Sequence, residues 1–256
     1  MRNGVSQNLI NDLAGQSMKD SIIVHGGGPS VTDLCIRLGI EPKFIHSPQG
    51  IRSRYTDLET MEVYIMAMRG KVNSSIVLSL QKAGINAVGM SGIDGQMIIA
   101  ERKKRLITIN GNGRRMYVDG GYTGKITRVD PEIMNSILSI GKTPVIAPIA
   151  ISQDFEALNV DADRAASAIA GTVKAERLIL LTDVDGVLIN GELVESFNIE
   201  EAKIVMKDVG NGMDKKIMGA IESMETGTRE VIIANGNAKY PISRALNSNR
   251  RTVIRK

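Results

Sequence analysis

Cysteine and aromatic residues are scarce in this sequence of 256 residues. It contains one cysteine, Cys35, no tryptophan, three phenylalanines and five tyrosines. A single cysteine excludes an internal disulfide framework and a cysteine-based zinc site, so the chain suits a reducing cytoplasm. The shortage of aromatic rings argues against base-stacking platforms, and therefore against nucleic acid as a partner.

Long apolar runs are missing as well. No stretch reaches the ~18 apolar residues of a transmembrane helix, and the opening MRNGVSQNLINDLAG lacks the apolar core of a signal peptide. Neither sign of charge dominates, because the sequence contains 32 Lys and Arg and 28 Asp and Glu, which gives a net charge of +4. We therefore expect no membrane association, no secretion and a cytoplasmic location. The hydrophobic fraction of 43% is sufficient for a buried core.

Strand-like and helix-like segments alternate along the chain. The patterns predict strands at residues 21–24, 86–89, 143–149, 177–181, 230–234 and 251–254, and helices at 29–38, 60–82, 131–139, 161–170, 199–208 and 214–226. This order predicts an α/β fold, a three-layer α/β/α sandwich with a mostly parallel central sheet. Residues 96–118 differ, because short β-type segments joined by polar and glycine turns predict inserted hairpins.

The HGGG segment at residues 25–28 follows the first predicted strand and precedes a helix. A glycine-rich loop in that position can hold an anion with its backbone N–H groups, although a tight turn without a ligand is the alternative. HGGG also occurs in the oxyanion hole of esterases, but their G-x-S-x-G motif fails here at Ile93, and both histidines precede Ser91. A P-loop fails too, since GGYTGK at 120–125 has the wrong spacing.

Carboxylates and lysines gather in three further loops. The segment NVDAD at 159–163 resembles a calcium loop, but Arg164 and Ala170 stand where Gly and Glu are required. One of its carboxylates can cap the following helix, and the other then needs a different explanation. DVDG at 183–186 is either a plain turn or the edge of a nucleotide site. Lys215 and Lys216 at a helix start gain nothing from the helix dipole, so an anionic ligand explains them better than a solvated face. Together these features indicate phosphoryl transfer, which depends on positioning and charge neutralisation.

Taken in order, HGGG, RYTD, NVDAD, LTDVDGV and GNGMDKK resemble the amino-acid kinase family, which includes acetylglutamate kinases, over nearly the whole chain. Three segments, SPQGIRSRYTD, AERKKR and GGYTGKI, are similar to its archaeal branch of aminoadipate and glutamate kinases, whose substrate is carried on the acidic protein LysW. The resemblance implies transfer of the ATP γ-phosphate to a side-chain carboxylate in lysine and arginine biosynthesis, giving an acyl phosphate.

The resemblance also assigns roles to individual residues. Gly27 and Gly28 would hold the substrate and the moving phosphate, with Gly27 part of the catalytic set. Arg54 would bind the α-carboxylate end of the terminal amino acid, and Asn159 its amide portion. Asp163 would orient the catalytic Lys216, which would neutralise charge on the phosphoryl group and on ADP. The nucleotide would be bound by Asp183, Val184, Asp185, Gly186, Val187, Gly212, Met213 and Lys216. No resident metal is expected, and Mg²⁺ would arrive with ATP.

Seven cationic residues fall between positions 102 and 125, namely Arg102, Lys103, Lys104, Arg105, Arg114, Arg115 and Lys125. They are either a solubilising surface or, as we expect, a patch that steers the acidic carrier protein and makes KM salt-sensitive. The resemblance further implies a homodimer. It divides a single domain into a substrate lobe at about 1–165, with the basic hairpin at 96–128, and an ATP lobe at about 166–256.

One departure and one open choice accompany the resemblance. The family opens with a strand carrying Lys-x-Gly-Gly, which does not occur near Met1, and we expect a misassigned start rather than an impaired product. The alternatives are a kinase of free N-acetylglutamate and a catalytically impaired regulator that binds ATP or amino acids. Ser53 resembles members that accept both aminoadipate and glutamate, so we expect both to be used.

Overall fold

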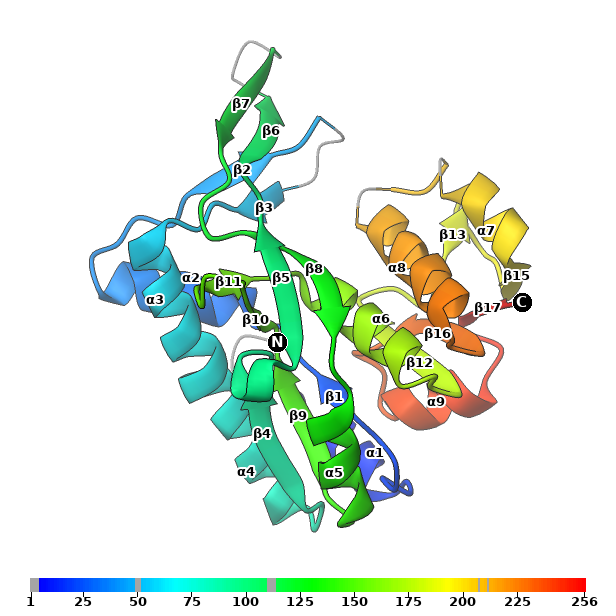
Figure 1. Ribbon diagram of the computed structural model, residues 1–256. Helices are drawn as coiled ribbons and strands as arrows, with labels where there is room; N and C mark the ends of the chain where they lie inside the picture. Colours follow the sequence, from blue (N-terminus) through cyan, green and yellow to red (C-terminus); the bar gives the residue numbers. More distant parts are fainter. Residues whose placement is uncertain (1–4, 49–51, 110–113, 207, 211) are drawn as a thin grey trace.

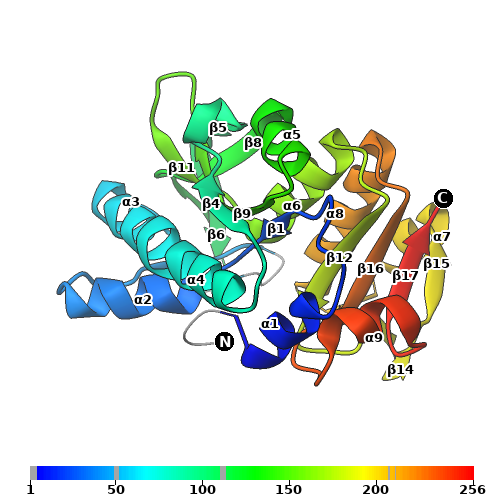
Figure 2. The same cartoon turned by 90° about the horizontal axis from the view of Figure 1, so that it is seen from below.

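The computed structural model describes residues 5–48, 52–109, 114–206, 208–210 and 212–256, and strands alternate with helices along it (Figure 1). The helices are α1 (Gln7–Ala14), α2 (Gly28–Arg37), α3 (Leu58–Ile65), α4 (Ser74–Lys82), α5 (Glu132–Ser139), α6 (Ala162–Thr172), α7 (Ile199–Val205), α8 (Met213–Thr226) and α9 (Pro241–Asn247). In Figure 2, α1, α2, α3, α4 and α9 lie on one side of the strands, and α5, α6 and α8 lie on the other. The predicted three-layer α/β/α fold is confirmed.

The strand layer consists of two main hydrogen-bonded blocks. One has the order β1 (Ile23–Val24), β9 (Thr143–Ala147), β4 (Ala87–Ser91), and all its strands are parallel. The other has the order β12 (Arg177–Thr182), β16 (Glu230–Asn235), β17 (Thr252–Arg255), β15 (Ser196–Asn198), with β17 antiparallel to β16. Every residue of β9 is buried, as expected for a parallel strand covered on both faces.

The inserted region forms hairpins, as predicted. β5 (Ile98–Arg102) pairs with β8 (Gly124–Val129), and β6 (Arg105–Ile109) pairs with β7 (Arg115–Asp119). β10 (Ile149–Ile151) and β11 (Ala157–Asn159) extend the β5–β8 sheet, and β2 (Phe44–His46) pairs with β3 (Arg52–Arg54). The β6–β7 hairpin projects from the top of the molecule in Figure 1. A short hairpin of β13 (Leu188–Ile189) and β14 (Glu192–Leu193) turns at Asn190-Gly191, both with positive φ.

The helix predicted at residues 60–82 begins earlier and changes its winding in the middle. Asp57 caps α3 by accepting a hydrogen bond from the Thr60 N–H at 2.9 Å. The chain then continues as a π-helical segment, η1 (Met66–Asn73), into α4. The backbone therefore widens around Gly70, and the helix does not break there. Such π-helical turns are frequent at functional sites.

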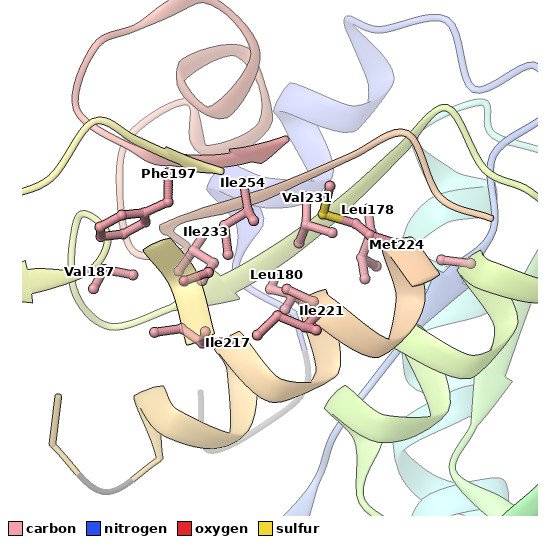
Figure 3. Packing of buried hydrophobic residues seen from close by; sticks show 13 residues of the cluster. Leu178, Leu180, Val187, Phe197, Ile217, Ile221, Met224, Val231, Ile233 and Ile254 are labelled. Atoms are coloured by element: carbon pink, nitrogen blue, oxygen red, sulfur yellow. The ribbon is translucent and has the colours of Figure 1, made fainter. Parts of the chain in front are cut away.

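The C-terminal core is built around α8, whose apolar face packs against β12 and β16 (Figure 3). Ile217 and Met224 of α8 are fully buried there, against Leu180 and Ile233. Each such side chain contributes about 1.5–3 kcal/mol on burial. This packing fixes the start of α8, and with it the two lysines of GNGMDKK.

Two helices that the sequence analysis did not predict join the ends of the chain. Asp12 of α1 is buried and accepts hydrogen bonds from the N–H groups of Ile242 and Ser243 at 2.6 and 2.9 Å, and from the Ser243 hydroxyl. It therefore caps α9 from the other end of the sequence.

None of the helices in the described part of the chain combines enough length with enough apolar character to cross a bilayer.

Candidate active site

A cavity of about 780 Å³ opens where the HGGG loop, the inserted hairpins and helices α6 and α8 meet. Two acidic side chains line it, Asp161 and Glu222. The basic side chains that line it are Arg52, Arg54, Lys103, Lys125, Arg128, Arg164 and Lys215. This excess of positive charge favours anionic ligands in the cavity.

The glycines at one end of the cavity leave room for a ligand beside the backbone. A Cβ on Gly27 would lie 2.6 Å from the sulfur of the buried Met68, so the close packing there requires glycine. A Cβ on Gly28 would meet no atom of the described residues within 4 Å, so this position faces open space among them. Gly27 precedes α2, and no side chain caps that helix. The geometry is that of an anion cradle at a helix start.

His25 anchors this loop and does not belong to the lining of the cavity. The residue is buried, and its Nδ1 lies 2.8 Å from the Gly26 carbonyl oxygen. Asn73 belongs to η1, and its Nδ2 lies 3.0 Å from His25 Nε2. The same Nδ2 donates a hydrogen bond to the Val145 carbonyl at 2.9 Å. Burial lowers the pKa of His25, so the ring is neutral at pH 7, donates from Nδ1 and accepts at Nε2. The π-helical segment thus holds the glycine loop against the sheet.

Arg54 reaches the cavity from the β2–β3 hairpin. Its Nη2 donates to the Gly28 carbonyl at 2.9 Å and to the Thr32 hydroxyl at 2.7 Å. Its Nη1 is buried and has no hydrogen-bond partner among the described residues. A buried guanidinium donor without a partner is costly, and a ligand carboxylate in the cavity would satisfy it.

Asn159 lies at the end of β11, on the cavity wall, and its Nδ2 donates to the Thr56 hydroxyl at 2.9 Å. Thr123 forms a bridge with Asn159, and its Oγ1 is buried without a partner among the described residues. The Oγ of the buried Ser167 on α6 also has no hydrogen-bond partner among the described residues. Arg54, Thr123 and Ser167, which carry these unpartnered atoms, all line the cavity, as expected where a polar ligand binds.

Lys216 and Asp163 are joined by an ion pair, with 2.6 Å between Nζ and Oδ2. Their side chains are 14% and 34% exposed. Asp161 caps α6 by accepting from the Arg164 N–H at 3.1 Å, which leaves Asp163 available for Lys216. The structure therefore brings these two side chains together, and their catalytic roles stay a prediction. Lys215, to which the resemblance gives no role, lines the cavity, whereas Lys216 does not belong to its lining.

The predicted nucleotide residues lie outside the lining of this cavity. Gly186 packs so closely that a Cβ would lie 2.5 Å from the Thr252 hydroxyl, which accepts a hydrogen bond from the N–H of the fully buried Val187. Asp185 accepts from Asn235 at 3.1 Å and forms ion pairs with two arginines. The remaining residues of the set, Asp183, Val184, Gly212 and Met213, flank the ends of β12 and α8. The nucleotide role of this group stays a prediction.

The seven cationic residues between positions 102 and 125 fall into three groups in the structure. Arg102 departs from the expected patch, because it donates to the Gly121 carbonyl at 2.6 Å and pairs with Glu156 at 3.0 Å. It therefore holds the hairpin in place. Lys103 and Lys125 line the cavity. The exposed outer cations of the β6–β7 hairpin are Lys104, Arg105, Arg114 and Arg115.

Comparison with known proteins places this fold and site in one class. The profile of the Amino acid kinase family matches residues 6–235. The chain therefore belongs to the amino acid kinase family. A protein of Saccharolobus islandicus named "[LysW]-aminoadipate/[LysW]-glutamate kinase" is 45% identical, over 96% of this chain and 93% of its own length. A protein of Nitrosopumilus maritimus, provisionally given the same name, is 49% identical over 91% of this chain and 87% of its own.

A solved structure supports the fold. N-acetylglutamate synthase from Neisseria gonorrhoeae, in complex with coenzyme A and N-acetyl-glutamate, superposes with a TM-score of 0.77 at 22% identity. The match covers 99% of this chain and 58% of that one.

Proposed function

We propose that this chain transfers the γ-phosphate of ATP to the side-chain carboxylate of an aminoadipate or glutamate that forms the C-terminus of an acidic carrier protein, LysW. The observation that carries the proposal is the cavity itself, where basic side chains outnumber acidic ones and Arg54 Nη1 has no partner among the described residues. The names of the relatives described above support the same substrate.

In the proposed reaction, a carboxylate oxygen forms a bond to the γ-phosphorus while the bond from that phosphorus to the β–γ bridging oxygen breaks. ADP leaves with the bonding electrons, the product is an acyl phosphate, and no proton has to move. Backbone N–H groups at Gly27 and Gly28 hold the reacting oxygens, and Arg54 takes the terminal α-carboxylate. Lys216, oriented by Asp163, neutralises the charge that develops on the phosphoryl group and the leaving ADP.

In this proposal ATP is the co-substrate, and Mg²⁺ is the counterion of its phosphates. Within the described residues, no three His, Cys, Asp or Glu side chains converge into a metal-binding group. Asp163 is already engaged by Lys216 at 2.6 Å. We infer that Mg²⁺ is held mainly by the phosphates of ATP, where it supplies further charge neutralisation.

The assembly and location are part of the proposal too. We infer a homodimer formed through the N-terminal half, which light scattering coupled to size-exclusion chromatography tests directly. We also infer a cytoplasmic location, because the one cysteine, Cys35, is free and buried in the core and needs no oxidising compartment.

The experiment that tests the function traps the acyl phosphate with hydroxylamine. Carrier protein ending in glutamate, carrier ending in aminoadipate and free N-acetylglutamate are compared, each with ATP and Mg²⁺. We expect turnover of both carriers, with kcat/KM values within about a hundredfold of each other, because one methylene contributes only ~1–3 kcal/mol. Turnover of N-acetylglutamate alone would instead identify a kinase of the free amino acid. ATP binding without any turnover would indicate a binding regulator.

A further inference from the structure

The loop at residues 183–186, which is predicted to bind the nucleotide, is fixed at both of its ends. Where the loop begins, the Gly236 N–H donates to the Thr182 carbonyl at 2.8 Å. Where it ends, the Val187 N–H donates to the Thr252 hydroxyl at 2.8 Å. The loop follows β12, which runs parallel to β16, so it lies at the carboxyl edge of these strands, where α/β proteins bind their ligands.

Both carboxylate oxygens of Asp185, inside this loop, are engaged by other side chains. Oδ1 accepts a hydrogen bond from Asn235 Nδ2 at 3.1 Å. Oδ2 lies 3.3 Å from Nη2 of Arg244 and 3.1 Å from Nε of Arg250. The Asp185 side chain is 21% exposed, whereas Asp183 of the same loop is exposed. Asp185 is therefore bound to protein partners, and Asp183 is the accessible acid of the loop.

The two arginines contribute differently to this anchor. The Arg244 side chain belongs to α9 and is 29% exposed, whereas the Arg250 side chain follows that helix and is 71% exposed. An exposed ion pair is screened by water and salt and stabilises little, whereas a largely buried pair is screened much less. Arg244 is therefore the main cation that holds Asp185.

The position of Arg244 is set from the other end of the chain. Its neighbour Ser243 donates through its N–H to the buried Asp12 of α1 at 2.9 Å, and the Ser243 hydroxyl accepts from Gln16 at 2.9 Å. In Figure 2, α1 lies between α4 and α9, and it shares an apolar cluster with Leu80 of α4. Contacts therefore run from the N-terminal half of the molecule through α1 and α9 to the loop.

We propose that Arg244 is a positioning residue for the nucleotide: with Asn235 it holds Asp185, and Asp185 holds the loop at 183–186 in the conformation that meets the nucleotide. This inference rests on the proposed function. It assigns Asp185 to the anchor and not to a nucleotide contact, because both of its oxygens already bind protein donors and its side chain is largely buried. Asp183 is then the carboxylate of this loop that is left to meet the nucleotide.

Calorimetric titration of the full chain with the ATP analogue AMP-PNP and Mg²⁺ tests the proposal. We expect Arg244→Met to raise Kd about tenfold, as for a residue that acts on a ligand through its neighbours. Arg244→Lys keeps the charge and should retain more of the affinity. Arg250→Met removes the exposed pair and should raise Kd by less than Arg244→Met does. The surface control Lys82→Met should leave Kd unchanged.

Combining Arg244→Met with Asp185→Asn separates an anchor from a direct contact. If Asp185 acts through the anchor, the two single variants and the double variant should have similar Kd values, because each removes the same interaction. In steady-state assays with the carrier, KM for ATP should rise in parallel, while kcat stays within about twofold, since uniform binding is lost. Urea unfolding of each variant separates this effect from a loss of stability.

Five results would overturn the inference: no binding of AMP-PNP by the unmodified chain, an Arg244→Met variant that loses stability and keeps its Kd, equal losses in Arg244→Lys and Arg244→Met, an equal loss in Arg250→Met, or effects of Arg244→Met and Asp185→Asn that multiply. The last would place Asp185 in contact with the nucleotide. Acyl-phosphate formation from the carrier is measured separately. Turnover with an unaffected Arg244→Met variant would leave the proposed function without this anchor, and coupled nucleotide binding without turnover would leave the anchor without that function.

Discussion

Among single residues, Lys216 carries the most specific chemical assignment, because it is largely buried and its Nζ lies 2.6 Å from Asp163. We expect Lys216→Met to lower kcat by about 10²–10³-fold, since one preorganised charge-stabilising donor is lost. ATP affinity, measured by calorimetry, should fall only modestly. Lys82→Met, on the exposed face of α4, is the matched control. Near-normal kcat in Lys216→Met would contradict the assignment.

Asn73 is fully buried and donates both to His25 and to the Val145 carbonyl. Replacing it by alanine leaves two buried acceptors without their donor and also leaves a cavity. We expect Asn73→Ala to lower the free energy of unfolding in urea by about 2–5 kcal/mol. The exposed Asn86→Ala should change it by less than about 0.5 kcal/mol. A similar change in the free energy of unfolding for both variants would contradict the anchoring role of Asn73.

The lowered pKa of His25 gives a pH dependence with a definite sign. The unfolded chain, where the ring has its ordinary pKa, binds a proton at a higher pH than the folded chain does. The His25 contribution to stability is therefore fully present above about pH 6.5 and is lost as the pH falls from there toward the lower folded pKa. Urea unfolding of the unmodified chain should show this loss, and His25→Gln should show a flatter profile in that window. Parallel profiles would contradict it.

Among the elements, the HGGG loop and η1 act together, because Met68 of η1 fills the space beside Gly27. We expect Gly27→Ala to destabilise the fold by about 1–3 kcal/mol through overpacking. In a Met68→Ala background, the additional cost of Gly27→Ala should be smaller than in the unmodified chain, because the clashing side chain is gone. Gly28→Ala meets no atom within 4 Å, so it should leave Tm unchanged and lower kcat/KM by occupying ligand space. A large Tm shift in Gly28→Ala would show that the space is not open.

Neighbouring basic residues in the inserted hairpins have different surroundings in the structure. The segment AERKKR is one basic block in the sequence, but Arg102 supports the hairpin, Lys103 lines the cavity, and Lys104 and Arg105 are exposed outside it. The turn between β5 and β6, which contains Lys103 and Lys104, accounts for part of this separation. The rest depends on Glu156 and Gly121, which no local pattern connects to Arg102.

For the whole molecule, the outer cations of the β6–β7 hairpin predict electrostatic steering of an acidic carrier. We expect KM for the carrier to rise several-fold with ionic strength, because exposed charges are screened. Steady-state assays over a salt series measure this. KM for free N-acetylglutamate, if it is turned over, should change much less. A carrier KM that does not respond to salt would leave the hairpin as a solubilising surface.

The sequence by itself determined the α/β alternation, the three layers, the inserted hairpins and the placement of the glycine and carboxylate loops between strand and helix. These features follow from local rules, such as apolar periodicity, glycine turns and caps like Asp161, which act over a few residues. Local rules did not predict helices α1 and α9. The contact that joins them, between Asp12 and Ser243, connects residues that are distant in the chain.

Only the tertiary structure decided which side chains share the cavity. It showed that Lys103 and Lys215 line the same cavity, that η1 holds the glycine loop through Asn73, and that Arg54 Nη1 has no partner in the part of the chain that the structure describes. The physical reason is that burial, hydrogen-bond satisfaction and charge repulsion depend on neighbours in space. Those neighbours come from segments that the chain brings together only when it folds.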